Sequence, residues 1–255
     1  MVETESRIDD ARVAAAFLTR LPLALAHPPG PGRLARASWA FPIVGLVIGI
    51  AGGLVYGVAH WLGLPPLLAA VFTVAAQIML TGALHEDAIA DVADGLGGGA
   101  TRERKLELMR DSRIGTFGAL ALILVFAARV AAVSAMAETE MVIAALVAAG
   151  ALSRASMVVV MDLIVPARSD GLSAQAGRPQ TGTVAAALII AVVLSLLALG
   201  PLTGTAGLAG AAFGTGGLAW IAWRQIGGHT GDVLGACQQM AEVFCLSVIV
   251  AVGLR

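Results

Sequence analysis

Seven long apolar stretches limit what this chain can fold into. Each comes close to or exceeds the roughly 20 residues that an α-helix needs to cross a bilayer. They lie at about 38–62, 66–84, 114–136, 141–163, 183–201, 205–226 and 234–254. Only 13% of the 255 residues are charged, where a soluble globular domain has about 25%. We therefore predict an all-α, polytopic integral membrane protein with about seven transmembrane helices, forming one domain over residues 1–255.

Residues 1–37 precede the first apolar stretch. They begin with polar and acidic residues, where a cleavable signal peptide would be basic, and they contain a proline- and glycine-rich run at 27–32. The pattern predicts a short N-terminal helix that lies at the membrane interface and ends at Pro22.

The positions of the basic residues predict the orientation. With the N-terminus in the cytoplasm, the inner connections hold all but three of the 16 lysines and arginines, the exceptions being Arg129, Arg154 and Arg255. The outer connections near 63–65, 137–140 and 202–204 hold none. Because short cytoplasmic loops are enriched in basic residues, we expect the N-terminus and the inner connections to face the cytoplasm. The expected location is the bacterial cytoplasmic (inner) membrane.

Four carboxylates are concentrated within nine residues: Glu86, Asp87, Asp91 and Asp94. On a helix, Asp91 lies about 40° from Asp87 and Asp94 about 20° to its other side, so three share one face. Such close carboxylates repel one another unless a cation or protons intervene. Mg²⁺ prefers oxygen ligands and commonly acts on phosphates. The spacing predicts a magnesium site formed by all four residues, with a solvated acidic helix end as the alternative.

A basic segment follows the acidic one. The glycines at 95 and 97–99 are expected to end the acidic helix, and Thr101 to cap a second helix over about 102–110. Residues 85–113 are thus predicted to form a cytoplasmic active-site segment that binds a pyrophosphate-bearing substrate. Its candidate substrate-binding residues are Arg102, Arg104, Arg110, Asp111, Ser112 and Arg113. Each basic residue could instead contact anionic lipid or only follow the positive-inside rule.

Two other inner connections, 166–182 and 227–235, are rich in polar and turn-forming residues. Arg178 lies in the first. In the second, Asp232 is a further candidate metal ligand, and His229 with Thr230 could contact phosphate or handle a proton. A lone histidine at an interface is also often structural.

Four charged residues fall inside the predicted spans: Arg129, Arg154, Asp162 and Glu242. Because charge is costly in lipid, they should face the bundle interior, either pairing or lining a polar cavity. The only two cysteines lie in the last apolar stretch and are expected to be packing residues.

Several runs of sequence resemble one family. The longest is His85-Glu-Asp-Ala-Ile-Ala-Asp-Val-Ala-Asp-Gly-Leu-Gly-Gly-Gly99, which continues through Arg102-Glu-Arg-Lys-Leu-Glu-Leu-Met-Arg-Asp-Ser-Arg-Ile-Gly-Thr-Phe-Gly118. Phe17-Leu-Thr-Arg-Leu-Pro22 and Gly227-Gly-His-Thr-Gly-Asp-Val-Leu-Gly-Ala236 flank it. These runs resemble the cobalamin synthase family, the adenosylcobinamide-GDP ribazoletransferases. Ala88 is a departure, since glycine is expected there.

The resemblance implies a magnesium-dependent membrane transferase. The family joins adenosylcobinamide-GDP to α-ribazole or its 5′-phosphate and releases GMP. The catalytic candidates are then Asp87, Asp91, Asp94 and Asp232, one of which would take the proton from the attacking hydroxyl. The expected partners are these small molecules and the lipid bilayer. No nucleic acid is expected, and a homo-oligomer remains open.

Three other functions are weaker matches. A CDP-alcohol phosphotransferase also has spaced aspartates, but its signature fails where Asp94-Gly95 is followed by Leu-Gly-Gly-Gly. A polyprenyl transferase usually has two aspartate-rich loops, and only one dense cluster occurs here. A transporter would explain charged residues within spans, but it would not explain four carboxylates beside a basic helix.

Overall fold

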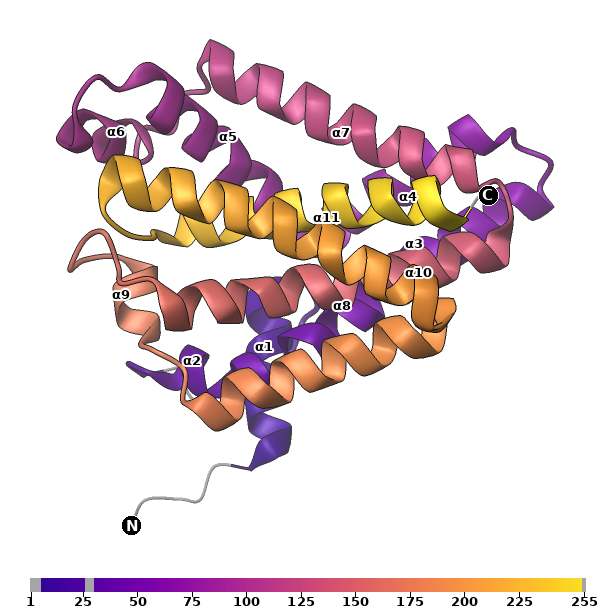
Figure 1. The fold of residues 1–255 in the computed structure, drawn as a ribbon, viewed down its shortest axis with the longest axis horizontal. Coiled ribbons are helices and arrows are strands. Elements are labelled where there is room, and N and C mark those ends of the chain that lie inside the picture. The colour runs from indigo at the N-terminus through magenta and orange to yellow at the C-terminus, as the bar shows by residue number, and fades with distance from the viewer. Residues whose placement is uncertain (1–5, 26–29, 254–255) are drawn as a thin grey trace.

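The computed structural model describes residues 6–25 and 30–253 as a bundle of helices (Figure 1). In chain order the elements are α1 (Arg7–Leu18), α2 (Arg33–Ala37), η1 (Ser38–Ala40), α3 (Phe41–Trp61), α4 (Pro66–Thr81), α5 (Leu84–Gly98), α6 (Arg102–Leu108), α7 (Thr116–Met136), α8 (Thr139–Leu163), α9 (Leu172–Ala176), α10 (Thr181–Ile226) and α11 (Gly231–Gly253). Within the described ranges the only β-type pairing is a single bridge between Pro166 and His229. The all-α prediction is confirmed.

Five segments are each long and apolar enough to cross a membrane: 33–61, α7, α8, α10 and α11. They coincide with predicted stretches, and α10 contains two of them. At Gly200 the α10 backbone leaves the helical region, with φ of 74° and ψ of 172°. The Ser195 hydroxyl donates a hydrogen bond to the Gly204 carbonyl oxygen (3.2 Å) across this break. The two arms of α10 therefore turn back at this break and diverge away from it in a V shape (Figure 1).

The predicted span 66–84 needs correction. Helix α4 has 16 residues and ends at Thr81, so it is too short to cross alone. Gly82 and Ala83 both have a positive φ, of 66° and 58°, which interrupts the helix. Helix α5 then leaves at 90° to α4, and the bent pair counts as at most one span. The total of seven crossings stays a prediction.

The N-terminal helix ends earlier than predicted, at Leu18 rather than Pro22. The chain becomes extended at Thr19, and the Arg20 backbone N–H donates to the Leu80 carbonyl oxygen (2.7 Å). The Arg20 side chain occupies the space beside Gly82. The first polar segment thus packs against the bend between α4 and α5. Residues 27–29, half of the proline- and glycine-rich run, lie outside the described residues.

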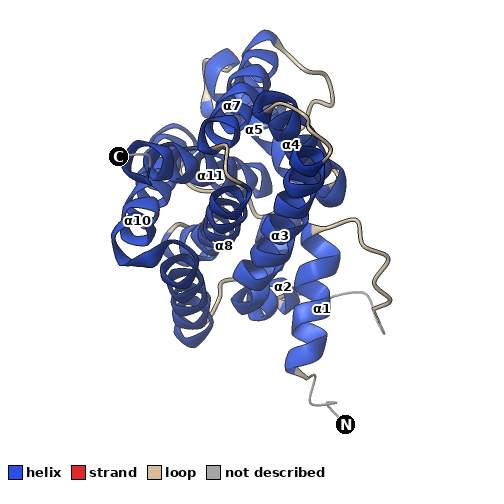
Figure 2. Cartoon of the chain, turned by 90° about the vertical axis from the view of Figure 1, so that its right-hand side faces the viewer, coloured by secondary structure: helices blue, strands red, loops and turns tan. Residues whose placement is uncertain are grey.

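Helix α8 lies in the middle of the bundle, in contact with α3, α10 and α11 (Figure 2). Glycines permit the close approach of α3: a Cβ atom on Gly49 would lie 2.5 Å from the Leu146 carbonyl oxygen, and Gly45 faces Gly150. Small residues let helix backbones approach in this way within membranes. Cys237 and Cys245 on α11 are buried free cysteines, which agrees with a packing role.

Candidate active site

The predicted inner connections meet at one end of the bundle. Arg102 at the start of α6 donates from Nε to the Ile226 carbonyl oxygen (2.9 Å) and from a terminal nitrogen to the Ala167 carbonyl oxygen. Arg110 pairs with Asp170 at 2.5 Å. The basic helix is therefore fixed to the 166–182 connection and to the end of α10, beside the acidic helix α5.

The acidic helix extends further than its glycines suggested. It runs through Gly95 and Gly97 and ends at Gly98. A Cβ atom on Gly95 would overlap the Met109 side chain, and one on Gly97 would overlap the Phe117 ring. Gly95 and Gly97 thus serve the packing of the segments that follow, while the predicted stop falls at the end of the glycine run, where Gly99 is the C-cap. Thr101 does cap the next helix, accepting a hydrogen bond from the Arg104 backbone N–H (3.2 Å).

The four carboxylates of α5 have separate environments. Glu86 points into the bundle, where its Oε1 accepts from Arg129 (2.8 Å) and from Gln239 (2.9 Å). Asp94 accepts the backbone N–H groups of Gly115 (2.7 Å) and Gly118 (2.8 Å), at the start of α7. The fold thus uses both for internal hydrogen bonds, and this competes with their predicted role as metal ligands.

Asp87 and Asp91 are different, because within the described residues neither side chain has a hydrogen bond or an ion pair. Helix α5 is not one of the segments that can cross a membrane alone. It places Asp87 and Asp91 on the side that faces Asp232, in the first turn of α11. Burial raises the pKa of Asp91 to about 7, and the nearby carboxylates of Asp87, Asp232 and Asp94 add to the increase. Mutual repulsion of this kind favours a bound cation.

The described ranges contain no group of three or more His, Cys, Asp or Glu residues already placed to hold a metal ion. In α5, two of the four carboxylates, Glu86 and Asp94, already accept hydrogen bonds from other parts of the protein. Mg²⁺ is usually held by one or two carboxylates and by substrate phosphates rather than by a complete protein cage. Asp87, Asp91 and Asp232 fit that donor chemistry. The magnesium site stays a prediction, centred on these three residues.

The raised pKa of Asp91 leads to a prediction on stability. In EDTA, the folded protein holds a proton on Asp91 up to about pH 7, whereas the unfolded chain loses it near pH 4. Stability should therefore fall as the pH rises between these values. In detergent, Asp91→Asn should remove this slope and unfold at a higher temperature than the wild type at pH 8. Equal slopes in the two proteins, measured by thermal unfolding, would contradict the assignment.

The predicted phosphate-binding arginines mostly have protein partners. Arg104 pairs with Glu107 (2.8 Å), and Arg178, which follows α9 by two residues, pairs with Asp162 (2.9 Å). Arg113 pairs with Asp111 (2.6 Å) and lowers the pKa of that carboxyl to about 2. Ser112 lies exposed in the same turn. These pairs are largely exposed, so a substrate phosphate could compete for the arginines at little cost.

His229 and Thr230 connect the loops around the site. The backbone of His229 bonds to Val165 and Ala167, and its Nδ1 lies 2.8 Å from the Ser173 hydroxyl. Burial lowers the pKa of His229, so its imidazole is neutral near pH 7. The Thr230 hydroxyl donates to Asp232 (3.2 Å) and accepts from the Val233 backbone N–H (3.2 Å). The direct contacts of both residues are structural, and their role toward substrate stays a prediction.

Sequence reasoning did not single out Arg168. Its guanidinium lies 3.8 Å from the Asp232 carboxylate, and its side chain is only 19% exposed. One terminal nitrogen, NH1, is buried with no hydrogen-bond partner within the described chain. Arg168 is therefore the cation that adjoins the acidic face and retains a free donor. Its place in a polar inner connection was the only sequence signal.

The charged residues within the spans behave as predicted in three of four cases. Arg129, Arg154 and Glu242 are buried, and Glu242 forms an ion pair with each of the two arginines. Asp162 is instead near the end of α8, partly exposed beside Arg178.

Comparison with known proteins shows the family of the chain. The family model of cobalamin-5-phosphate synthase matches residues 10–250. The chain belongs to this family. Curated relatives named adenosylcobinamide-GDP ribazoletransferase include one from Bradyrhizobium diazoefficiens, 50% identical, with 96% of this chain and 94% of the relative covered. Another, from Azorhizobium caulinodans, is 42% identical, and the match covers 94% of this chain and 95% of the relative.

A third relative with the same name, from Mesorhizobium japonicum, is 43% identical, and the match covers 94% of this chain and 92% of the relative. No solved structure matches the chain. Membership of the cobalamin-5-phosphate synthase family identifies the chain as an enzyme of cobalamin biosynthesis and confirms the resemblance seen in its sequence. Arg168, Asp232 and the acidic helix all lie within the matched residues.

Proposed function

We propose that this protein is a magnesium-dependent adenosylcobinamide-GDP ribazoletransferase of the bacterial cytoplasmic membrane. The observation that carries the proposal is that Asp91 lies near the carboxylates of Asp87 and Asp232, and that Asp232 lies 3.8 Å from Arg168, at the end of the bundle where the inner connections converge. Asp87 and Asp91, which have no partner within the described residues, together with a guanidinium that keeps a free donor beside Asp232, suit a pyrophosphate-bearing substrate and its cation. Family membership supplies the reaction class.

In the proposed reaction, a hydroxyl group of α-ribazole or of its 5′-phosphate attacks the phosphorus nearer the cobinamide. A new phosphorus–oxygen bond forms, the bond to the bridging oxygen breaks, and GMP leaves with the other phosphate. Asp87 and Asp91 would hold magnesium, which neutralises charge that develops on the phosphate oxygens. Asp232, on a separate helix, would accept the proton of the attacking hydroxyl. Arg168 would bind the pyrophosphate.

The test is GMP release by detergent-purified protein supplied with adenosylcobinamide-GDP and α-ribazole. Release should require magnesium and should stop in EDTA. A transferase turns over without a sealed membrane, whereas a transporter needs two compartments. No release with any divalent metal, from a protein that is monodisperse and folded, would overturn the proposal.

Arg168→Ala should raise the KM for adenosylcobinamide-GDP by about tenfold to a hundredfold, because a hydrogen bond to a charged group contributes about 1.5–3 kcal/mol. Arg168→Lys should recover part of the loss, since lysine keeps the charge but not the planar donor set. Arg12→Ala is the matched control, as Arg12 is exposed in α1 beside Asp9. An unchanged KM in Arg168→Ala, from initial rates of GMP release, would exclude the proposed contact.

A further inference from the structure

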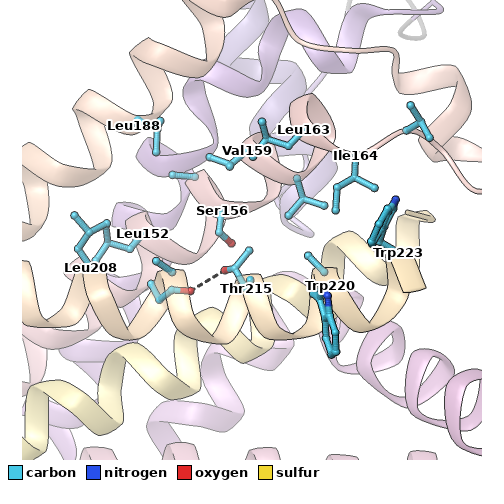
Figure 3. Close-up of a pocket in the computed structure, with 17 residues that line it drawn as sticks. Leu152, Ser156, Val159, Leu163, Ile164, Leu188, Leu208, Thr215, Trp220 and Trp223 are labelled. Atoms are coloured by element: carbon cyan, nitrogen blue, oxygen red, sulfur yellow. Dashed lines mark hydrogen bonds between the residues drawn. The ribbon is translucent and has the colours of Figure 1, made fainter. Parts of the chain in front are cut away.

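A large apolar cavity lies between α8 and α10, and no residue of the acidic helix lines it. It has a volume of 820 Å³ and is bounded by α8 and both arms of α10 (Figure 3). Leu152, Val159 and Leu163 line the α8 side, Leu188 comes from the first arm of α10, and Leu208 comes from the second. A cavity of this size suits the apolar part of a small molecule.

The two hydroxyl groups in the cavity already have partners. The Ser156 hydroxyl donates to the Ser153 carbonyl oxygen (2.6 Å), and the Thr215 hydroxyl donates to the Ala211 carbonyl oxygen (2.8 Å). A polar ligand placed here would lose its hydrogen bonds to water and gain few in return. The lining therefore selects an apolar occupant.

One end of the cavity has the chemistry of a membrane interface. Trp220 and Trp223 lie there, each more than half exposed (Figure 3), as expected of tryptophans at headgroup level. The Arg224 guanidinium lies 5.8 Å from the centre of the Trp220 ring. Within the described residues Arg224 is exposed and has no carboxylate partner. Its positive charge next to an apolar cavity is complementary to an anionic amphiphile.

This end also faces the predicted cytoplasm. Arg224 is two residues before Ile226, whose carbonyl oxygen is bound by Arg102, so it lies at the end of the bundle that carries the inner connections. Anionic phospholipids attract basic residues at that surface.

We propose that this cavity binds a membrane phospholipid with an anionic headgroup. The acyl chain lies between α8 and the second arm of α10, and the phosphate lies against Arg224, flanked by Trp220 and Trp223. The site is separate from the acidic face and does not depend on which reaction that face performs.

Two neighbouring glycines provide a matched test. Gly216 lines the cavity, Gly217 does not, and a Cβ atom on either one would meet no other atom within 4 Å. Gly216→Leu should therefore fill the cavity, whereas Gly217→Leu should leave it open. Both replacements favour helix formation, so both variants should fold.

The measurement is native mass spectrometry of protein incubated in detergent with equimolar phosphatidylglycerol and phosphatidylcholine. The wild type should retain phosphatidylglycerol about fivefold over phosphatidylcholine, as expected for one basic residue at the membrane surface. Gly216→Leu should lose the bound lipid, and Gly217→Leu should keep it. Arg224→Gln, at an exposed position, should keep bound lipid but lose the preference for the anionic headgroup.

Each alternative result would overturn the proposal. Absence of retained lipid in the wild type, or equal retention by the two glycine variants, would show that lipid does not occupy the cavity. An unchanged headgroup preference in Arg224→Gln would remove the anionic part of the site. A corrinoid or a second copy of the chain as occupant would appear as a higher KM or a lost dimer in Gly216→Leu, with lipid retention unchanged.

Discussion

Asp91→Asn is expected to reduce magnesium-dependent GMP release by about 10²- to 10⁴-fold, the range found when a group that acts on the reacting atoms is removed. Asp91 is one helical turn after Asp87 on α5 and faces Asp232 on α11. Asparagine keeps the size of the side chain but removes the charge that would hold the cation. The loss should therefore appear in kcat and in the magnesium concentration needed for half-maximal rate.

Two features of this experiment separate catalysis from folding. The variant should be at least as stable as the wild type near pH 8, because a carboxylate that repels its neighbours has been neutralised. Glu140→Gln is the matched acid-to-amide control, exposed at the other end of the bundle. Full activity in Asp91→Asn would place the cation elsewhere, and Asp232 would be the next residue to replace.

The acidic face of α5 could be predicted because it depends only on the spacing of Asp87, Asp91 and Asp94 along one helix. The sequence could not predict how the four carboxylates divide. Glu86 is bound by Arg129 and Gln239, and Asp94 by backbone N–H groups at the start of α7. Those partners are distant in the sequence and come close only when the helices pack.

The sequence predicted most of the fold for the same reason: long apolar runs identify helices that match a bilayer. It did not predict the 90° bend before α5, because it depends partly on Ala83, a residue that rarely adopts a positive φ. Nor did it separate Arg168 from the other inner arginines. Arg168 became distinct only through its approach to Asp232.

A buried charge network lies deeper in the bundle, behind the acidic helix. Glu242 on α11 forms ion pairs with Arg129 on α7 (2.9 Å) and with Arg154 on α8 (3.0 Å). Arg129 also pairs with Glu86 on α5 (2.8 Å). Two guanidinium groups and two carboxylates thus balance one another, and they connect α5 to three other helices. Gln238 adds a hydrogen bond to Glu242 (2.6 Å).

Glu242→Ala should lower the free energy of unfolding by about 3–5 kcal/mol, because removing one member of a buried ion pair leaves the other uncompensated. Here two arginines lose their shared partner, and both have side chains less than 5% exposed. The expected readouts are a large drop in the apparent unfolding temperature in detergent and poor recovery of monodisperse protein. An unfolding temperature equal to that of the wild type would contradict a structural role for the network.

Combining Glu242→Leu with Arg154→Leu should recover much of that stability. The double replacement removes one charge of each sign and leaves the Arg129–Glu86 pair intact, and apolar residues of suitable size often replace buried ion pairs without loss. Arg154→Leu alone should be less stable than the double variant, because it leaves Glu242 with Arg129 as its sole cationic partner. If the double variant is no more stable than Glu242→Ala, packing around Glu242 rather than charge balance holds these helices together.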